Sequence, residues 1–408
     1  MLKEYQKGIK MNDLWKIKLG KLIYHYREQL YQETKNEKWK QENFLKDQTG
    51  WICSRPTFLN MKKGVPLKNE KKYFQLANRL NKKIKIDSKV DQLLEYYSNL
   101  LYEAEIIFDA NEIIAICKQA ITALTPYKEC LYYEEYYRLF YRLERYYSLK
   151  DALFTIKEYQ HFKAIFDLFH DKTQEVLVYL FLVFGFQTSK KISDDTISDY
   201  HVNQRKYFPT KLVYLTHQNT TSKYSSIEQY KKLEKEAKEL HSFHLITIYR
   251  GLMIRYEKLE IEKAYEYANK LENILQNTDV SQFQRDNTIA NLGLFYTRSK
   301  IPEKAIPFLE ETLSVSKSNI SSKLIALCFN YVSLGKPLDS TLFKVKFEPD
   351  VEESNCLLVQ YYQFYNQINN KEKRAMLSKI ASLLNEEDNF FKFIIVEENN
   401  KLSYINLK

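Results

Sequence analysis

The sequence predicts an all-α protein in which a small basic N-terminal domain precedes a long array of helices. Only 8 Gly and 8 Pro occur in 408 residues, which favours long helices joined by short links. From residue 90 onward, segments with apolar residues one turn apart follow one another without a convincing alternating strand. Charge is uneven, because residues 1–90 hold 22 Lys and Arg against 9 Asp and Glu, whereas the remainder holds 40 against 43.

The N-terminal domain begins with a predicted helix over residues 14–30, whose apolar residues recur at helical spacing. Residues 40–64 then predict two short helices joined by a tight turn. Gly50 is expected to end the first helix, because glycine adopts the left-handed conformation at little cost. Ser54 is expected to cap the second helix and Gly64 to stop it. A further helix is predicted over residues 68–80.

Two short helices joined in this way form a helix-turn-helix, whose second helix enters the DNA major groove. The segment 53–64 resembles the lambda-repressor-like (XRE-type) family. Lys62 stands where that family usually has Glu, and Leu59 where it often has Ser. The residues that fit the family pattern are Ser54, Thr57, Phe58, Met61 and Gly64. The resemblance implies that residues 1–85 are a DNA-binding domain; the alternative is an ordinary helical hairpin capped by Ser54.

The basic excess lies entirely in this domain, and basic charge concentrated in one small domain favours phosphate binding. Base contacts are expected from Arg55, Thr57 and Asn60, because Arg and Asn can form bidentate bonds to guanine and adenine. Phosphate contacts are expected from Lys40, Ser54, Lys62 and Lys63, and the resemblance adds Gln41 to the DNA-binding set. The alternative for the lysines is solubility alone. All three tryptophans (Trp15, Trp39 and Trp51) are expected to pack in the core of the domain.

Residues 86–408 predict a tetratricopeptide-like helical-repeat solenoid. In the clearest unit, Leu292-Gly293, Tyr296 and Ala305 fit the tetratricopeptide spacing. Gly293 and Ala305 are expected to be the small residues at which the two paired helices approach closely, and Pro302 begins the second helix. Weaker units follow Gly251 and Ala326. The alternative is a generic helical bundle. Residues 188–206 are polar and are predicted to be a loop.

Catalytic and metal-binding patterns are absent from the sequence, so we expect neither an enzyme, a cofactor nor a metal site. There is no glycine-rich phosphate loop, and His241 and His244 lie three residues apart without a third ligand. Pairs of acidic residues such as Glu134-Glu135 are expected to be solvated helix faces.

The expected compartment is a reducing cytoplasm. The five cysteines are scattered, odd in number and form no CxxC pair. No signal peptide is visible. The most apolar run, residues 176–186, is about half of what a bilayer requires, so it predicts a buried helix and no membrane partner.

A basic XRE-like head followed by helical repeats resembles the peptide-pheromone receptors of low-GC Gram-positive bacteria and their phages. This group is known as RRNPP (Rap, Rgg, Npr, PlcR and PrgX), and the phage arbitrium receptors share its layout. The resemblance implies a quorum-sensing transcription regulator that binds operator DNA, an inverted repeat, as a homodimer. It also implies that the repeats bind a short signalling peptide, which changes the dimer geometry and the DNA affinity.

Asparagine suits a peptide groove because its side chain both donates and accepts hydrogen bonds. The first candidates for peptide binding are Asn291 and Asn330, with Tyr249, Arg250 and Asn287 as weaker ones; the alternative is that these are ordinary surface residues. Two rival functions remain open. One is a DNA-binding regulator without a peptide, and the other is a Rap-like module that docks a partner protein without sequence-specific DNA binding. The departures at Leu59 and Lys62 leave room for the second.

Overall fold

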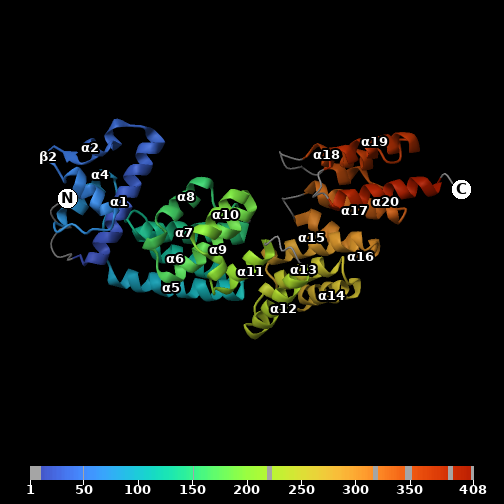
Figure 1. The fold of residues 1–408 in the computed structure, drawn as a ribbon, viewed down its shortest axis with the longest axis horizontal. Helices are drawn as coiled ribbons and strands as arrows, with labels where there is room; N and C mark the ends of the chain where they lie inside the picture. Colours follow the sequence, from blue (N-terminus) through green and yellow to red (C-terminus); the bar gives the residue numbers. More distant parts are fainter. Residues whose placement is uncertain are drawn as a thin grey trace. The chain divides into compact units, whose positions relative to one another are not determined.

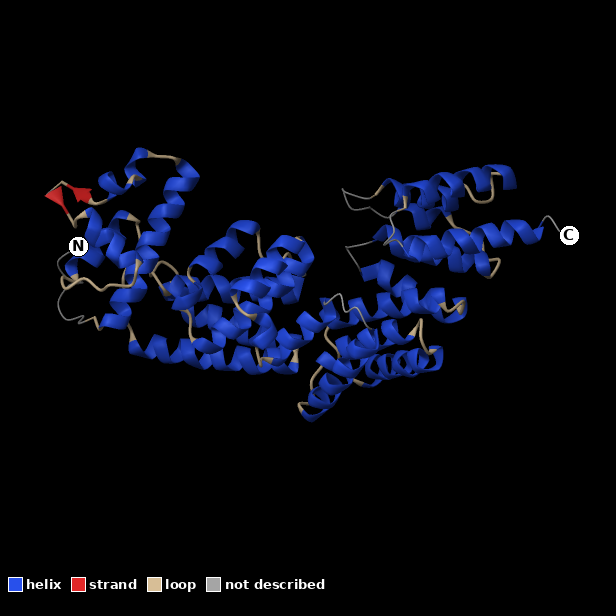
Figure 2. Ribbon diagram, in the orientation of Figure 1, coloured by secondary structure: helices blue, strands red, loops and turns tan. Residues whose placement is uncertain are grey.

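The computed structural model describes residues 11–48, 50–149, 151–217, 223–315, 320–344, 352–384 and 389–405. Over these residues the chain forms twenty α-helices and a single two-stranded hairpin, which confirms the all-α class (Figures 1 and 2). Contacts divide the chain into two compact units, residues 1–245 and residues 246–408. The predicted domain boundary after residue 85 falls inside the first unit.

The first unit begins with the basic head, residues 11–80. Its helices and strands are α1 (Asp13–Thr34), η1 (Glu37–Trp39), α2 (Gln41–Phe44), β1 (Lys46–Asp47), β2 (Gly50–Trp51), α3 (Arg55–Lys62) and α4 (Lys71–Arg79). The predicted helices over 14–30, 54–64 and 68–80 are therefore present as α1, α3 and α4.

The prediction that Gly50 ends the first short helix is wrong. Helix α2 already ends at Phe44, and β1 and β2 form a hairpin in which Lys46 pairs with Trp51. Leu45 and Ile52 flank this hairpin, and both are buried. The Ile52 backbone N–H donates to the Leu45 carbonyl at 2.9 Å. Burying both side chains in one small core requires the chain to reverse between them, which a continuing helix would not allow.

The rest of the first unit is a packed set of helices that follows the head. They are α5 (Ser88–Ile107), α6 (Ala110–Leu124), η2 (Thr125–Tyr127), α7 (Tyr133–Leu149), α8 (Ile156–Ala164), η3 (Phe166–Leu168), α9 (Asp171–Thr188), α10 (Lys190–Asp199), η4 (Val202–Gln204), α11 (Phe208–His217) and α12 (Lys223–Glu239). The apolar run 176–186 lies in α9 and is largely buried, as predicted. No helix in the described ranges combines the length and the apolar character needed to cross a bilayer.

The predicted loop over 188–206 is instead mostly helical, because its small polar residues pack against α9. A Cβ atom placed on Gly185 of α9 would lie 2.7 Å from the backbone nitrogen of Ser193 in α10. Ser193 and Thr196 of α10 are buried. Glycine on one helix and small side chains on the other permit this close approach, and a polar composition hides it in the sequence.

The second unit is a succession of helices, each packed on the next. Its elements are α13 (His244–Tyr256, which begins at the end of the first unit), α14 (Ile261–Asn277), α15 (Gln282–Arg298), α16 (Pro302–Val315), α17 (Ile320–Ser333), η5 (Ser340–Lys344), α18 (Glu353–Gln363), α19 (Asn370–Leu383) and α20 (Asn389–Ile405). Helix α15 also contacts α17.

The predicted close approach of α15 and α16 is confirmed at two small residues. A Cβ atom on Gly293 would lie 2.8 Å from Leu309 Cγ, so only glycine fits there. Ala305 is fully buried, and Pro302 begins α16 as the sequence predicts.

Candidate functional site

Helix α3 is fixed to α1 by its inward face. Phe58 is fully buried, and its ring centroid lies 5.2 Å from that of Tyr24 and 5.7 Å from that of Phe44. One turn along, a Cβ atom on Gly20 of α1 would lie 3.3 Å from Met61 Cβ. The helix therefore has one orientation, because rotating it would expose two large apolar side chains.

Both ends of α3 are as predicted. The Ser54 hydroxyl accepts a hydrogen bond from the Thr57 backbone N–H at 3.3 Å, and the two hydroxyl oxygens lie 2.7 Å apart. Beyond the last helical residue, Gly64 has a φ of +80°, a conformation that glycine adopts without strain. The helix start that carries Arg55 is therefore defined by a side-chain cap.

The outward face of α3 is basic and solvent-exposed. Arg55, Asn60 and Lys63 are exposed, and so is Lys62, whose Nζ lies 5.0 Å from the centroid of the Tyr24 ring. No carboxylate of the described chain lies within ion-pair distance of Arg55, Lys62 or Lys63, whereas Lys16 and Lys21 of the same head are paired with Glu70 and Asp167. Clustered cations without acidic partners produce a positive field that suits a phosphate backbone.

Two predicted contacts lie at the start of α2. Lys40 is exposed but already paired, since its Nζ lies 2.7 Å from a Glu37 oxygen, and this hydrogen bond raises the pKa of Lys40. Gln41 is half-buried, and its Nε2 has no hydrogen-bond partner in the described chain. An acceptor supplied by a ligand would satisfy that amide.

The tryptophan prediction holds for Trp15, which is buried with its ring 5.1 Å from that of Tyr132, and it is wrong for Trp51. Trp51 is 54% exposed on the hairpin, with Lys46 Nζ 4.5 Å from its ring centroid. The next two residues, Ile52 and Cys53, occupy the buried positions, so no room is left in the core for the indole.

The predicted peptide-binding residues lie on α13, α15 and α17 of the second unit. Tyr249 is buried against Tyr267, and Arg250 is half-buried. Asn287 is exposed, and the Asn291 amide donates to the Asn287 carbonyl at 2.6 Å. Asn330 is only 1% exposed, and its Nδ2 donates to Thr297 Oγ1 at 2.8 Å and to the Ala326 carbonyl at 2.7 Å.

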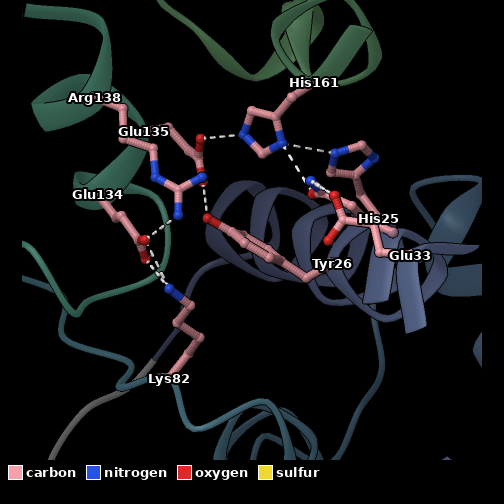
Figure 3. Close-up of polar contacts among 9 residues, drawn as sticks. His25, Tyr26, Glu33, Lys82, Glu134, Glu135, Arg138 and His161 are labelled. Atoms are coloured by element: carbon pink, nitrogen blue, oxygen red, sulfur yellow. Dashed lines mark hydrogen bonds and ion pairs between the residues drawn. The ribbon is translucent and has the colours of Figure 1, made fainter. Parts of the chain in front are cut away.

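A second polar site, at the joint between α1 and helices α7 and α8, was missed by the sequence reasoning (Figure 3). The expectation that Glu134-Glu135 form a solvated face is wrong, because both are buried. Glu134 forms two ion pairs: Lys82 Nζ lies 2.5 Å from its Oε2, and Arg138 Nη2 lies 2.5 Å from its Oε1. One feature of the sequence indicates that Glu135 is buried. It lies four residues before the buried Leu139, on the edge of the apolar stripe of α7.

The centre of this joint is a chain of hydrogen bonds. His161 Nε2 lies 2.5 Å from Glu135 Oε2, and the Tyr26 hydroxyl donates to the other Glu135 oxygen (Figure 3). His161 Nδ1 lies 3.0 Å from His25 Nε2. Burial alone would raise the pKa of Glu135, but the nearby His161 and Arg138 outweigh it and hold that pKa at about 2. Burial, reinforced by His161, lowers the pKa of His25 to about 4.

A cavity of about 410 Å³ opens beside the two imidazoles, between α1 and α8. Other lining residues include Gln29, Glu33, Lys157 and Gln160. Within the described ranges, no three His, Cys, Asp or Glu side chains are grouped so as to hold a metal ion. His241 is exposed, whereas His244 is buried with its Nε2 2.9 Å from the Glu105 carbonyl.

No protein-family model matches the chain, and neither a curated protein nor a solved structure shows significant similarity to it. Function is therefore inferred from the geometry of these sites.

Proposed function

We propose that the protein is a DNA-binding transcriptional regulator, in which α3 reads operator bases and a short signalling peptide binds the second unit. The observation that carries the DNA-binding part is the outward face of α3, where Arg55, Lys62 and Lys63 are exposed without acidic partners. A cation without an ion-pair partner inside the chain breaks no salt bridge when it pairs with a phosphate, and the counterions released from the DNA favour the pairing.

The position of each side chain along α3 suggests its role. The N-terminal half of a recognition helix contacts base edges, and Arg55 is exposed at the first position of α3. Asn60 is exposed in the second half of the helix. Lys62 and Lys63 come at the other end, where a helix leaves the groove and passes the backbone. A homodimer that presents two such helices about one DNA turn apart would recognise an inverted repeat.

Replacement of Arg55 with Ala is expected to relax base preference at one operator position by roughly 1–3 kcal/mol. Lys63→Gln is the matched control, because loss of a phosphate contact weakens all sequences nearly equally and reduces the salt slope by about one. Both are measured by fluorescence anisotropy on fragments enriched from the source genome, at several salt concentrations. An Arg55→Ala variant with unchanged sequence preference would show that α3 does not read bases through this residue.

The peptide part of the proposal is supported by helix pairing in the second unit. The close approach at Gly293 and the buried Ala305 are the small-residue contacts that tetratricopeptide-like pairs need, which supports a solenoid with a concave face. On α15, Asn287 and Asn291 offer accessible amides to a peptide backbone. Asn330 and Tyr249 are buried, so their participation requires local rearrangement.

A peptide specific to the folded state must raise its stability, by about 2.7 kcal/mol at a peptide concentration 100 times the Kd. We expect at least one short peptide encoded near the gene to raise the unfolding temperature of the full chain. Asn291→Ala should reduce that increase, whereas the exposed Asn277→Ala in α14 should not. A library of such peptides that leaves the unfolding temperature unchanged would favour a regulator without a peptide.

Docking of a partner protein is the second candidate, and a specific observation favours it. Trp51 and Leu59 are 54% and 37% exposed on the same head as the cations, and exposed apolar side chains are typical of protein interfaces. Salt dependence separates the two candidates. DNA binding through several phosphates falls steeply with salt, so a nearly flat response would favour protein docking.

A further inference from the structure

Helix α1 connects α3 to the body of the first unit. Gly20 and Tyr24 hold α3, whereas the next turn carries His25 and Tyr26, which bond to α7 and α8. A change in the second set of contacts therefore acts on the helix that carries α3. The hydrogen bonds at this joint connect residues 109 and 136 positions apart in the sequence, so they hold separate parts of the fold together.

We propose that this joint is an acid-operated latch, in which protonation of the His25–His161 pair releases the C-terminal half of α1 from α7 and α8, while the packing of Trp15 on Tyr132 and Tyr133 keeps its N-terminal half in place.

The closed latch is complete when both imidazoles are neutral. A carboxylate accepts only, so His161 Nε2 must donate to Glu135, which leaves Nδ1 of His161 as an acceptor. His25 Nε2 can then donate to this Nδ1 across 3.0 Å. The Tyr26 hydroxyl supplies the second hydrogen bond to Glu135. Each of these three contacts then has one donor and one acceptor.

Two added protons cannot both be accommodated. The first can reside on His161, with the bond between the rings reversed so that His25 accepts. A second proton would place two N–H groups and two positive charges 3.0 Å apart. Gln29 Oε1 lies 3.3 Å from His161 Nδ1 and can accept one of these hydrogen bonds, but it carries no charge to offset the repulsion. Opening separates the charges and returns both rings to water.

The surrounding charges do not relieve this repulsion, because each nearby carboxylate is already engaged. Glu134 is paired with Lys82 and Arg138, and Glu135 with His161. The remaining charged groups that face the pair are Glu28, which pairs with Arg27, and Glu33, which lies 3.7 Å from Lys157. The cavity beside the rings gives protons a route to them.

The sign of the pH dependence follows from His25. Its pKa is about 4 in the closed latch and 6.5 when the ring is free, so opening takes up a proton between these values. The contribution of His25 to the closed latch is complete above pH 6.5. Below pH 6.5, His25 lowers the closed-to-open ratio by up to tenfold for each pH unit, because its ring binds one proton on opening.

Hydrogen exchange of the full chain tests the latch, with rates corrected for the intrinsic effect of pH. In the wild type, the corrected exchange rates of the backbone amides of residues 25–34 and 156–164 should rise by up to tenfold for each unit by which the pH falls from 6.5 to 5. His25→Gln cannot be protonated but can still donate to His161, so its opening should not vary with pH. His241→Asn is the matched control, because this exposed histidine has a φ of +51° that asparagine tolerates. The latch would be overturned if exchange in the wild type did not depend on pH, or if the exchange rates of His25→Gln changed with pH as steeply as those of the wild type.

A second measurement does not depend on how well the variants fold. NMR titration of the imidazoles in the wild-type chain should give His25 a midpoint well below 6.5, and a midpoint at 6.5 would overturn the proposal.

The effect of the latch on DNA binding rests on the proposed function. One comparison tests the latch and the proposed function separately. DNA affinity is measured at pH 7.5 and 5.5 for the wild type and His25→Gln. A change with pH in the wild type alone supports regulation through the latch. If the latch opens without any change in DNA affinity, that regulation is rejected. If the protein binds no DNA at either pH, the proposed function is rejected, and hydrogen exchange still tests the latch.

Discussion

Replacement of Glu105 with Gln is expected to make the first unit progressively more stable than the wild type as pH rises, by roughly 4 kcal/mol between pH 4.5 and pH 8. Glu105 lies in α5 and is fully buried. Its two oxygens lie 2.9 and 3.0 Å from the Tyr147 hydroxyl, and no cation is paired with it in the described chain. Burial raises the pKa of this carboxyl to about 8, against the opposing effect of the Tyr147 hydrogen bond.

The direction follows from proton binding. The folded state keeps Glu105 protonated up to about pH 8, whereas the unfolded chain ionises near pH 4.5. Its contribution is therefore complete below pH 4.5 and is lost as pH rises toward 8. Gln cannot ionise, so the variant lacks this loss. A buried amide with unmatched donors costs roughly 1–3 kcal/mol, which should make the variant slightly less stable at pH 4.5.

Urea unfolding at pH 5 and pH 8 measures this effect. Tryptophan fluorescence reports on the first unit, because all three tryptophans (Trp15, Trp39 and Trp51) belong to it. Glu103→Gln is the control, since Glu103 lies on the same helix and is exposed. A variant-minus-wild-type difference that stays constant with pH would show that Glu105 is ionised in the folded protein at neutral pH.

The second large effect is expected from Phe58→Ala, which should cost about 3–5 kcal/mol of stability, the usual range for removing a buried aromatic ring. The ring is fully buried between Tyr24 and Phe44 and is the main contact of α3 with the core of the head. Loss of this contact should also abolish DNA binding, because α3 would no longer be held on α1.

The neighbouring residue provides a matched comparison. Leu59 is 37% exposed on a side of α3 that faces solvent, so Leu59→Ala should change stability by less than about 0.5 kcal/mol. Both variants are compared by urea unfolding with tryptophan fluorescence. Equal costs for the two variants would mean that the inward face of α3 has been assigned wrongly.

Several features of the head could be predicted because they depend on neighbours in the chain. Ser54 caps α3 by a bond to a residue three positions away, and Gly64 follows its last turn. The buried Phe58 and Met61 lie three residues apart, the spacing of one helical face. In the second unit, Gly293 and Ala305 were predicted as small residues at a helix–helix contact because a fixed spacing carries that signal.

The all-helical class, the concentration of basic charge in the head and the ends of α3 can be predicted from the sequence, since composition and contacts within one turn govern these. The hairpin before α3, the exposure of Trp51 and the burial of Glu134 and Glu135 depend on packing between distant parts of the chain and became visible only in the fold. The fold also brings His25 to His161, which is 136 residues away in the sequence. No local pattern records such a contact, because an isolated polar residue on a helix looks the same in the sequence whether water or another helix covers it.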